Sequence, residues 1–185
     1  MGCEKPLLAV GGIPLVVRVA RAVAPCVAEL FVVTNHPDLY EFLGKPMIPD
    51  TWPGRGPLGG LHAALKATRG PAALIVAGDY PFLVPAAIAR IAREKPGGGV
   101  VLPRIRGILH PLCAIYGSAA LGVVEESLGA GELMVRSFVA RLAERKILDE
   151  TEFGGREEAE RVFTNVNTPE ELRRAEEARA GAQSR

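Results

Sequence analysis

An aspartate at the end of an apolar run is the residue best placed for chemistry. Asp79 stands in Val76-Ala77-Gly78-Asp79-Tyr80-Pro81, where the apolar stretch 72–77 predicts a buried strand. A carboxylate just beyond such a strand can hold a divalent cation close to phosphate groups. An aspartate ahead of a Tyr-Pro pair can also cap the following helix. The sequence therefore favours metal binding by Asp79 and leaves capping open as a second, compatible role.

Two further segments contain glycine ahead of a predicted helix. In Pro53-Gly54-Arg55-Gly56-Pro57-Leu58-Gly59-Gly60, backbone N–H groups could approach a base or a phosphate closely. Many Gly-Pro segments are only turns, so this one carries little weight alone. Lys5 lies in a similar setting near the N-terminus and could neutralise triphosphate charge. A lone lysine there is ordinarily just solvated, so its role depends on the other motifs.

Three polar residues in the second half of the chain complete the set of candidates. His110 precedes Pro111 in a predicted strand, where it either faces a cleft or packs on the sheet, and packing is favoured. Asn165 and Asn167 are two residues apart on a predicted last strand, so they would share one face. Local hydrogen bonding in a turn is the alternative role for both asparagines.

Alternating helices and strands must position these residues. Apolar periodicity and Gly/Pro punctuation predict a three-layer α/β domain with a mostly parallel sheet, in which ligands bind at the carboxyl ends of the strands. An antiparallel hairpin interrupts the pattern at 99–116, with its turn at Gly107. Residues 1–185 form one domain, and the polar tail after about residue 178 is expected to fray. The predicted helices are 14–24, 37–43, 57–68, 84–93, 119–128, 134–144 and one opening at Thr168; the predicted strands are 29–34, 45–48, 72–77, 99–105, 108–116 and 161–166.

Composition narrows the class of protein. The chain has 185 residues, a formal net charge of +1 and 48% hydrophobic residues, which suits one globular domain and argues against non-specific nucleic-acid binding. No membrane-spanning run and no signal peptide are recognisable. The three cysteines are scattered without CxxC or zinc spacing. We expect a cytoplasmic protein with reduced thiols and with neither nucleic acid nor a membrane as its partner.

Taken in order, the motifs resemble those of the molybdenum cofactor guanylyltransferases, within the wider nucleotidyltransferase group. That family opens with a pattern like L-A-G-G-x-S-x-R-M-G-x-x-K-x-L-L, of which this chain holds only the end. Gly78 stands where the family usually has cysteine. The matching segments span nearly the whole chain: Met1-Gly2-Cys3-Glu4-Lys5-Pro6-Leu7-Leu8, Gly12-Ile13-Pro14-Leu15, Gly56-Pro57-Leu58-Gly59-Gly60, Gly78-Asp79-Tyr80-Pro81-Phe82-Leu83, His110-Pro111-Leu112 and Phe163-Thr164-Asn165-Val166-Asn167-Thr168-Pro169-Glu170-Glu171-Leu172.

The resemblance implies a Rossmann-like (GT-A-like) enzyme that transfers GMP from GTP to the terminal phosphate of molybdopterin or Mo-molybdopterin. It implies Mg²⁺ as the cofactor, Asp79 as its ligand, and Lys5 with Asp79 as the catalytic pair. A molybdoenzyme or another protein of cofactor biosynthesis is the implied partner. By the same resemblance Gly2, Lys5, Asn35, Asp50, Gly56, Pro57 and Asp79 bind the nucleotide, and His110, Asn165 and Asn167 lie on the pterin side.

One departure and several alternatives qualify this reading. The L-A-G-G segment would supply the first, central strand and the loop that holds the triphosphate. Because the chain does not contain it, we expect an incomplete or misassigned start and an impaired enzyme. Related activities remain alternatives, namely those of adenosylcobinamide-phosphate guanylyltransferases and molybdopterin cytidylyltransferases. A degenerate protein that binds pterin or nucleotide without catalysis is the alternative from another class.

Overall fold

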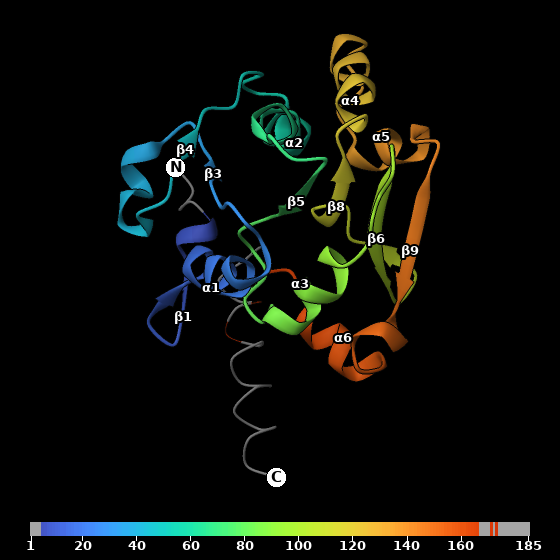
Figure 1. Ribbon diagram of the computed structural model, residues 1–185. Helices are drawn as coiled ribbons and strands as arrows, with labels where there is room; N and C mark the ends of the chain where they lie inside the picture. Colours follow the sequence, from blue (N-terminus) through green and yellow to red (C-terminus); the bar gives the residue numbers. More distant parts are fainter. Residues whose placement is uncertain (1–4, 167–170, 172, 174–185) are drawn as a thin grey trace.

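The computed structural model describes residues 5–166, 171 and 173, and its centre is a mixed, five-stranded sheet (Figure 1). Strand β8 (Cys113–Gly117) lies between β5 (Ala72–Val76) and β6 (Val100–Ile105) and is antiparallel to both. Strand β9 (Arg145–Asp149) pairs with β6 in parallel. The strands β5, β6 and β9 therefore run in one direction, as the predicted α/β class requires.

The predicted hairpin is present. Strand β7 (Ile108–Leu109) pairs antiparallel with the end of β6. Arg106 and Gly107 form the turn. Their φ values of 50° and 75° are both positive, as a type I′ turn in a two-residue hairpin loop requires. The predicted second strand is interrupted at 110–112, so that β7 and β8 are separate strands.

Helices cover both faces of this sheet, which confirms the three layers (Figure 1). Apolar residues of α1, α3 and α6 pack on one face, and those of α2, α4 and α5 pack on the other. Successive residues of β8 alternate between the two cores, with Cys113 and Ile115 in the first and Ala114 and Tyr116 in the second. The helices are α1 (Leu15–Val23), α2 (Gly56–Ala67), α3 (Pro85–Ala92), α4 (Ala120–Gly129), α5 (Val135–Arg141) and α6 (Arg156–Val162).

Two small sheets stand apart from the central one. Strands β3 (Val32–Val33) and β4 (Met47–Ile48) pair in parallel, and β1 (Ala9–Val10) pairs antiparallel with β2 (Ile13–Pro14). None of the helices in the part of the chain that the structure describes is long and apolar enough to cross a membrane. Short 3₁₀ turns complete the fold: η1 (Lys5–Leu7), η2 (Ala24–Cys26), η3 (Pro37–Leu39), η4 (Glu41–Leu43) and η5 (Glu150–Phe153).

The predicted strand at 161–166 is wrong. Arg161 and Val162 end α6, and residues 163–166 belong to no strand. The sheet instead ends on β9, which the sequence did not reveal because Arg145, Lys146 and Asp149 are exposed. An edge strand needs only one apolar side, so its composition resembles that of a surface loop. The predicted helix start at Thr168 lies outside the described residues.

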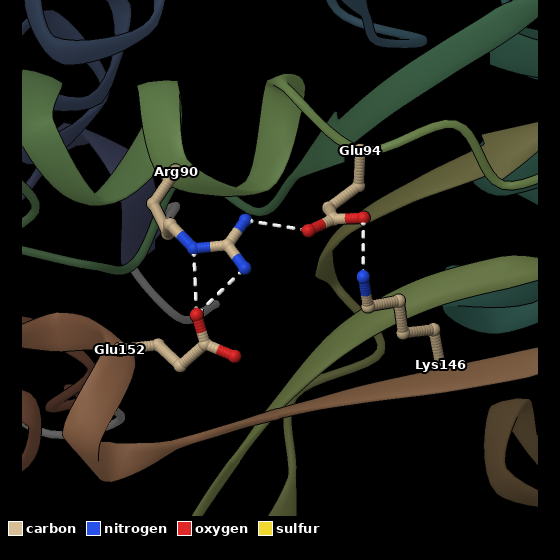
Figure 2. A network of polar contacts seen from close by, with 4 residues as sticks. All are labelled: Arg90, Glu94, Lys146 and Glu152. Carbon is tan, nitrogen blue, oxygen red and sulfur yellow. Dashed lines mark hydrogen bonds and ion pairs between the residues drawn. The ribbon is translucent and has the colours of Figure 1, made fainter.

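A network of charged side chains joins α3 to β9 and η5 (Figure 2). The Arg90 guanidinium lies 2.7 Å from a Glu94 carboxylate oxygen and 2.6 Å from a Glu152 oxygen. The Lys146 ammonium binds the other oxygen of Glu94 at 2.7 Å. Hydrogen bonds from Lys146 and Arg90 lower the pKa of Glu94. The Glu94 carboxylate, two residues beyond the end of α3, thus links Arg90 of that helix to Lys146 of β9.

Glycine at the end of β8 permits a close backbone approach, which gives a stability prediction. A Cβ at Gly117 would run into the carbonyl oxygen of Gly97. Gly117→Ala should lower the free energy of unfolding by about 1–3 kcal/mol, because the backbone must shift. Gly122, inside α4, has no atom within 4 Å of an added Cβ, so Gly122→Ala should raise it by about 0.4–1 kcal/mol. Urea unfolding of both variants measures this, and equal effects would contradict it.

Candidate functional site

The ends of β3 and β4 bring two predicted residues together. Asn35 lies two residues beyond β3, and Asp50 lies two residues beyond β4. Because the two strands are parallel, their carboxyl ends meet at one edge. The Asp50 backbone N–H donates to the side-chain oxygen of Asn35 at 2.9 Å. The structure therefore places in direct contact two of the residues to which the resemblance assigns nucleotide binding.

The Asp50 carboxylate lies against the first turn of α2. Its Oδ1 accepts the backbone N–H of Trp52 at 2.8 Å. A Cβ at Gly59 would lie 2.8 and 2.9 Å from the two carboxylate oxygens, which is closer than real Cβ contacts allow. Negative charge is favoured near a helix N-terminus. Glycine at position 59 thus lets the carboxylate reach the start of α2, a contact that the sequence alone does not reveal.

The glycine-rich turn leads directly into this helix. Gly56 and Pro57 are the first two residues of α2 and are both exposed. Gly56 has φ of +62°, which favours glycine, and Pro57 suits the first helical turn because it lacks an N–H. The turn therefore holds the helix start beside Asp50.

The predicted metal ligand lies in a loop just beyond β5. Asp79 is three residues past Val76, and its backbone carbonyl accepts the N–H of Val166 at 3.1 Å. Asn165, which is exposed, is therefore carried next to the Asp79 loop. A Cβ at Gly78 would lie 2.9 Å from the Cβ of Pro6, so η1 packs directly against this loop.

His110 packs into the same region from the segment between β7 and β8. Its Nδ1 lies 3.2 Å from the Tyr80 hydroxyl, and its ring centroid lies 5.3 Å from that of Phe163. Burial raises the pKa of Tyr80 well above its usual range, so this hydroxyl keeps its proton and can donate it to Nδ1. With Nδ1 as the acceptor of this bond, the neutral imidazole carries its proton on Nε2.

Charge on His110 is disfavoured by its surroundings. Burial, with a smaller contribution from the positive charge of Arg136, lowers the pKa of His110 to about 4. The ring is therefore neutral at physiological pH. It can donate a hydrogen bond there, but it cannot serve as a cationic group.

A groove of about 570 Å³ borders several of these segments. Pro6 of η1, Pro57 of α2 and Gly78 of the Asp79 loop all line it. Lys5, Gly56 and Asp79 each stand next to one of these lining residues in the sequence. Gly2, Asn167 and the side chain of Lys5 lie outside what the structure describes, so their roles stay predictions.

Asp79 is the residue that the sequence predicts to bind a metal ion, so the other possible metal ligands among the described residues matter. Among the described residues, no group of three or more His, Cys, Asp or Glu side chains could enclose an ion. Mg²⁺ is commonly held by one or two carboxylates, with substrate phosphates and water supplying the other ligands. A single aspartate is therefore compatible with a cation that arrives with a nucleotide.

Comparisons with known proteins agree on one family. The family model described as MobA-like NTP transferase domain matches residues 1–146. A relative from Pelotomaculum thermopropionicum, named probable molybdenum cofactor guanylyltransferase, is 34% identical over 175 residues, which is 95% of this chain and 85% of that protein. The molybdenum cofactor guanylyltransferase of Cereibacter sphaeroides is 35% identical over 181 residues, covering 95% and 88% of the two chains.

Solved structures agree with the fold. Molybdopterin-guanine dinucleotide biosynthesis protein A from Archaeoglobus fulgidus superimposes with a TM-score of 0.79 at 25% identity, covering 97% of this chain and 92% of that one. The 2-C-methyl-D-erythritol 4-phosphate cytidylyltransferase of Thermus thermophilus has a TM-score of 0.69 at 18% identity, covering 95% and 94%. The second similarity supports the fold alone.

The environment of His110 gives a prediction on pH. Between pH 6.5 and about 4 the unfolded chain binds a proton at this residue and the folded chain does not. Stability should therefore fall as pH falls through this window, by about 1–3 kcal/mol allowing for partial solvent screening. NMR titration should give a midpoint near 4 for the ring.

His110→Gln provides the control, because it removes the titrating group and keeps a polar side chain. Its free energy of unfolding should depend less on pH over the same window. A midpoint near 6.5 for His110, or identical pH profiles for the two proteins, would contradict the assignment.

Proposed function

The chain belongs to the MobA-like NTP transferase domain family, and we propose that it transfers GMP from GTP to the terminal phosphate of molybdopterin. The observation that carries this proposal is the agreement between the guanylyltransferase relatives, matched over most of the chain, and the contact of Asn35 with Asp50 at the start of α2. The broader class, a nucleotidyltransferase, follows from the family itself.

The nucleoside is bound, in this proposal, beside the first turn of α2. Asn35 offers an amide and Asp50 a carboxylate, so the site presents both hydrogen-bond donors and acceptors. Guanine also has donors and acceptors along one edge. Each polar group is fixed by a backbone contact, Asn35 by the N–H of Asp50 and Asp50 by the N–H of Trp52. Fixed polar groups discriminate strongly because a wrong base leaves them unpaired.

The triphosphate is held between η1 and the Asp79 loop. Lys5 supplies positive charge, and Asp79 supplies the protein ligand for Mg²⁺. When bound with the nucleotide, Mg²⁺ neutralises the negative charge of the phosphates. The packing of Pro6 on Gly78 supports this arrangement, because it holds the backbone of η1 against the loop that carries Asp79.

The acceptor approaches from the side of His110 and Asn165. An oxygen of its terminal phosphate forms a bond to the α-phosphorus of GTP, the bond from that phosphorus to the β-phosphate oxygen breaks, and pyrophosphate leaves. No covalent enzyme intermediate is needed, since the acceptor phosphate is itself the nucleophile. The two residues orient the acceptor, His110 through its neutral Nε2–H and Asn165 through its amide. We also propose a cytoplasmic location and a molybdoenzyme or cofactor-biosynthesis protein as the partner that receives the product.

Replacing the Asp79 carboxylate should lower the transfer activity without changing the fold. Asp79→Asn is expected to lower Mg²⁺-dependent transfer at least about 100-fold, because the metal loses its protein ligand. Pyrophosphate release from GTP and molybdopterin over a range of Mg²⁺ concentrations measures it, with circular dichroism to monitor the fold. Asp38→Asn, at an exposed site in η3, is the matched control and should retain turnover. Normal turnover in Asp79→Asn would remove Asp79 from the metal site.

Nucleotide choice tests the nucleoside site. GTP should compete better than CTP or ATP, and Gly59→Ala should weaken GTP binding about tenfold or more, because the new methyl group displaces the Asp50 carboxylate. Gly122→Ala, in open space on α4, is the control for a glycine replaced within a helix. A preference for CTP would assign the protein to the cytidylyltransferases. Absence of binding to any nucleotide would favour a non-catalytic accessory protein.

A further inference from the structure

His62 is a buried histidine of α2 with a hydrogen-bond partner for each of its ring nitrogens. It lies in the second turn of the helix, and 2% of its surface is exposed. Its Nδ1 lies 3.2 Å from the Thr51 hydroxyl, and its Nε2 lies 3.4 Å from a carboxylate oxygen of Glu125 in α4. A buried polar group without partners is costly to the fold, so these two contacts account for a histidine at this position.

The two partners determine which nitrogen of the neutral ring carries the proton. An ionised carboxylate can only accept hydrogen bonds, so Nε2 donates to Glu125. In the neutral ring Nδ1 is then an acceptor, and the Thr51 hydroxyl donates to it. Thr51 is exposed, so without His62 its hydroxyl would bond to water instead. The attachment of Thr51 to α2 thus depends on the orientation of the His62 ring, which Glu125 sets.

The turn 50–52 lies along one face of α2. Gly59 and His62 are three residues apart, so they are neighbours on the surface of the helix. A Cβ at Gly59 would meet the Asp50 carboxylate and would lie 2.9 Å from the backbone carbonyl oxygen of Trp52. The ring of Trp52 also meets that of His62 edge-on, with the centroids 6.2 Å apart. Gly59 and His62 together therefore form the surface against which the turn packs.

Helix α4 anchors this arrangement in the core. It packs beside α2 (Figure 1), and Val124 and Leu128 belong to the same apolar cluster as Leu58 and Leu61 of α2. Glu125 follows Val124 in the sequence and is half exposed, so its carboxylate reaches the buried ring from the edge of the helix pair. Hydrogen bonds therefore run from a helix held in the core, through the histidine, to the turn.

We propose that His62 is a positioning residue for nucleoside binding, which holds the turn 50–52 on α2 and so fixes the direction of the Asp50 carboxylate. The inference rests on the proposed nucleoside site at Asn35 and Asp50. The backbone N–H of Asp50 donates to Asn35, and the Asp50 carboxylate accepts the N–H of Trp52. These two bonds set the shape of the turn, whereas the contacts with His62 set its place on the helix.

The proposal predicts an effect on binding and not on the transfer step. Asp79 lies on a different loop, against which Pro6 and the backbone of Val166 pack. A displaced Asp50 carboxylate would weaken the binding of the nucleoside equally in the ground state and in the transition state. The KM for GTP should therefore rise while kcat changes little. A substitution that only destabilises the fold would not produce this difference between KM and kcat.

Thr51 gives the mildest test, because it is exposed and its replacement leaves the core intact. In the full chain, Thr51→Val removes the hydroxyl and keeps the shape. It should raise the Kd and the KM for GTP about three- to tenfold and change kcat by less than about twofold. Thr51→Ser keeps the hydroxyl and should bind GTP as the unsubstituted protein does. His62→Phe should behave like Thr51→Val, and His62→Gln, which can still donate and accept, should restore part of the affinity.

Trp52, the single tryptophan of the chain, reports on the turn without nucleotide. The backbone N–H groups of Asp50 and Trp52 are both hydrogen-bonded, so their exchange rates measure how firmly the turn is held. In Thr51→Val and His62→Phe these two amides should exchange at least about fivefold faster than in the unsubstituted protein. Acrylamide should also quench the fluorescence of Trp52 more strongly in both variants.

Ser127→Ala is the matched control, because it removes another buried hydrogen-bonding side chain, which contacts Val123 and Arg141. It should lower Tm and leave both the exchange of the two amides and the affinity for GTP unchanged. An equal loss of GTP affinity in Ser127→Ala would make His62 an ordinary core residue and overturn the proposal.

Two other results would also overturn it. Unchanged amide exchange in Thr51→Val would show that His62 does not hold the turn. Faster exchange with normal GTP affinity would show that the position of the turn does not affect nucleoside binding. If the unsubstituted protein binds no nucleotide, the proposed function fails together with the nucleoside part of this inference. Faster exchange in the two variants would then still support the contact of His62 with the turn, so the two failures are distinguishable.

Discussion

The central constraint on this fold is that helices cover both faces of the sheet. Apolar residues of β8 alternate between two cores, so neither face of the sheet is left for a binding site. Polar side chains can then gather only where strands end. Asp79 stands three residues beyond β5 of this sheet, and Asn35 and Asp50 stand two residues beyond the strands of the separate β3–β4 sheet. The layering thus accounts for the position of the Asp79 loop, and the parallel pairing of β3 with β4 accounts for that of Asn35 and Asp50.

Two glycines let side chains come close to the backbone, and these contacts determine the geometry of the site. Gly59 gives the Asp50 carboxylate access to the first turn of α2, and Gly78 gives Pro6 access to the loop before Asp79. In both places a single methyl group would fill the space that another segment occupies. The two glycines therefore matter because they lack a side chain that would block these contacts. Gly59 thereby sets the position of the Asp50 carboxylate against α2, and Gly78 sets that of Pro6 against the Asp79 loop.

Structural elements that depend on local sequence pattern can be predicted from the sequence, whereas contacts between separate elements cannot. The layers and the hairpin turn at Gly107 follow from apolar runs and punctuation, and both were predicted correctly. The sequence does not predict β9 because its exposed Arg145 and Lys146 resemble a loop, and it predicts a strand at Phe163 and Val166 because these residues are apolar. Both are buried in the cores without belonging to a strand. The contact of Asp50 with Gly59 depends on the packing of α2, which no local pattern encodes.

The environment of His110 bears on how a transfer reaction at this site can proceed. Burial beside Tyr80 and Phe163 keeps the ring neutral, and its Nδ1 is already within hydrogen-bonding distance of the Tyr80 hydroxyl. A ring in that state is a poor proton acceptor near pH 7. A phosphate nucleophile, however, is ionised at that pH and needs no base. In the proposed reaction, His110 would therefore position the acceptor and would not take a proton from it.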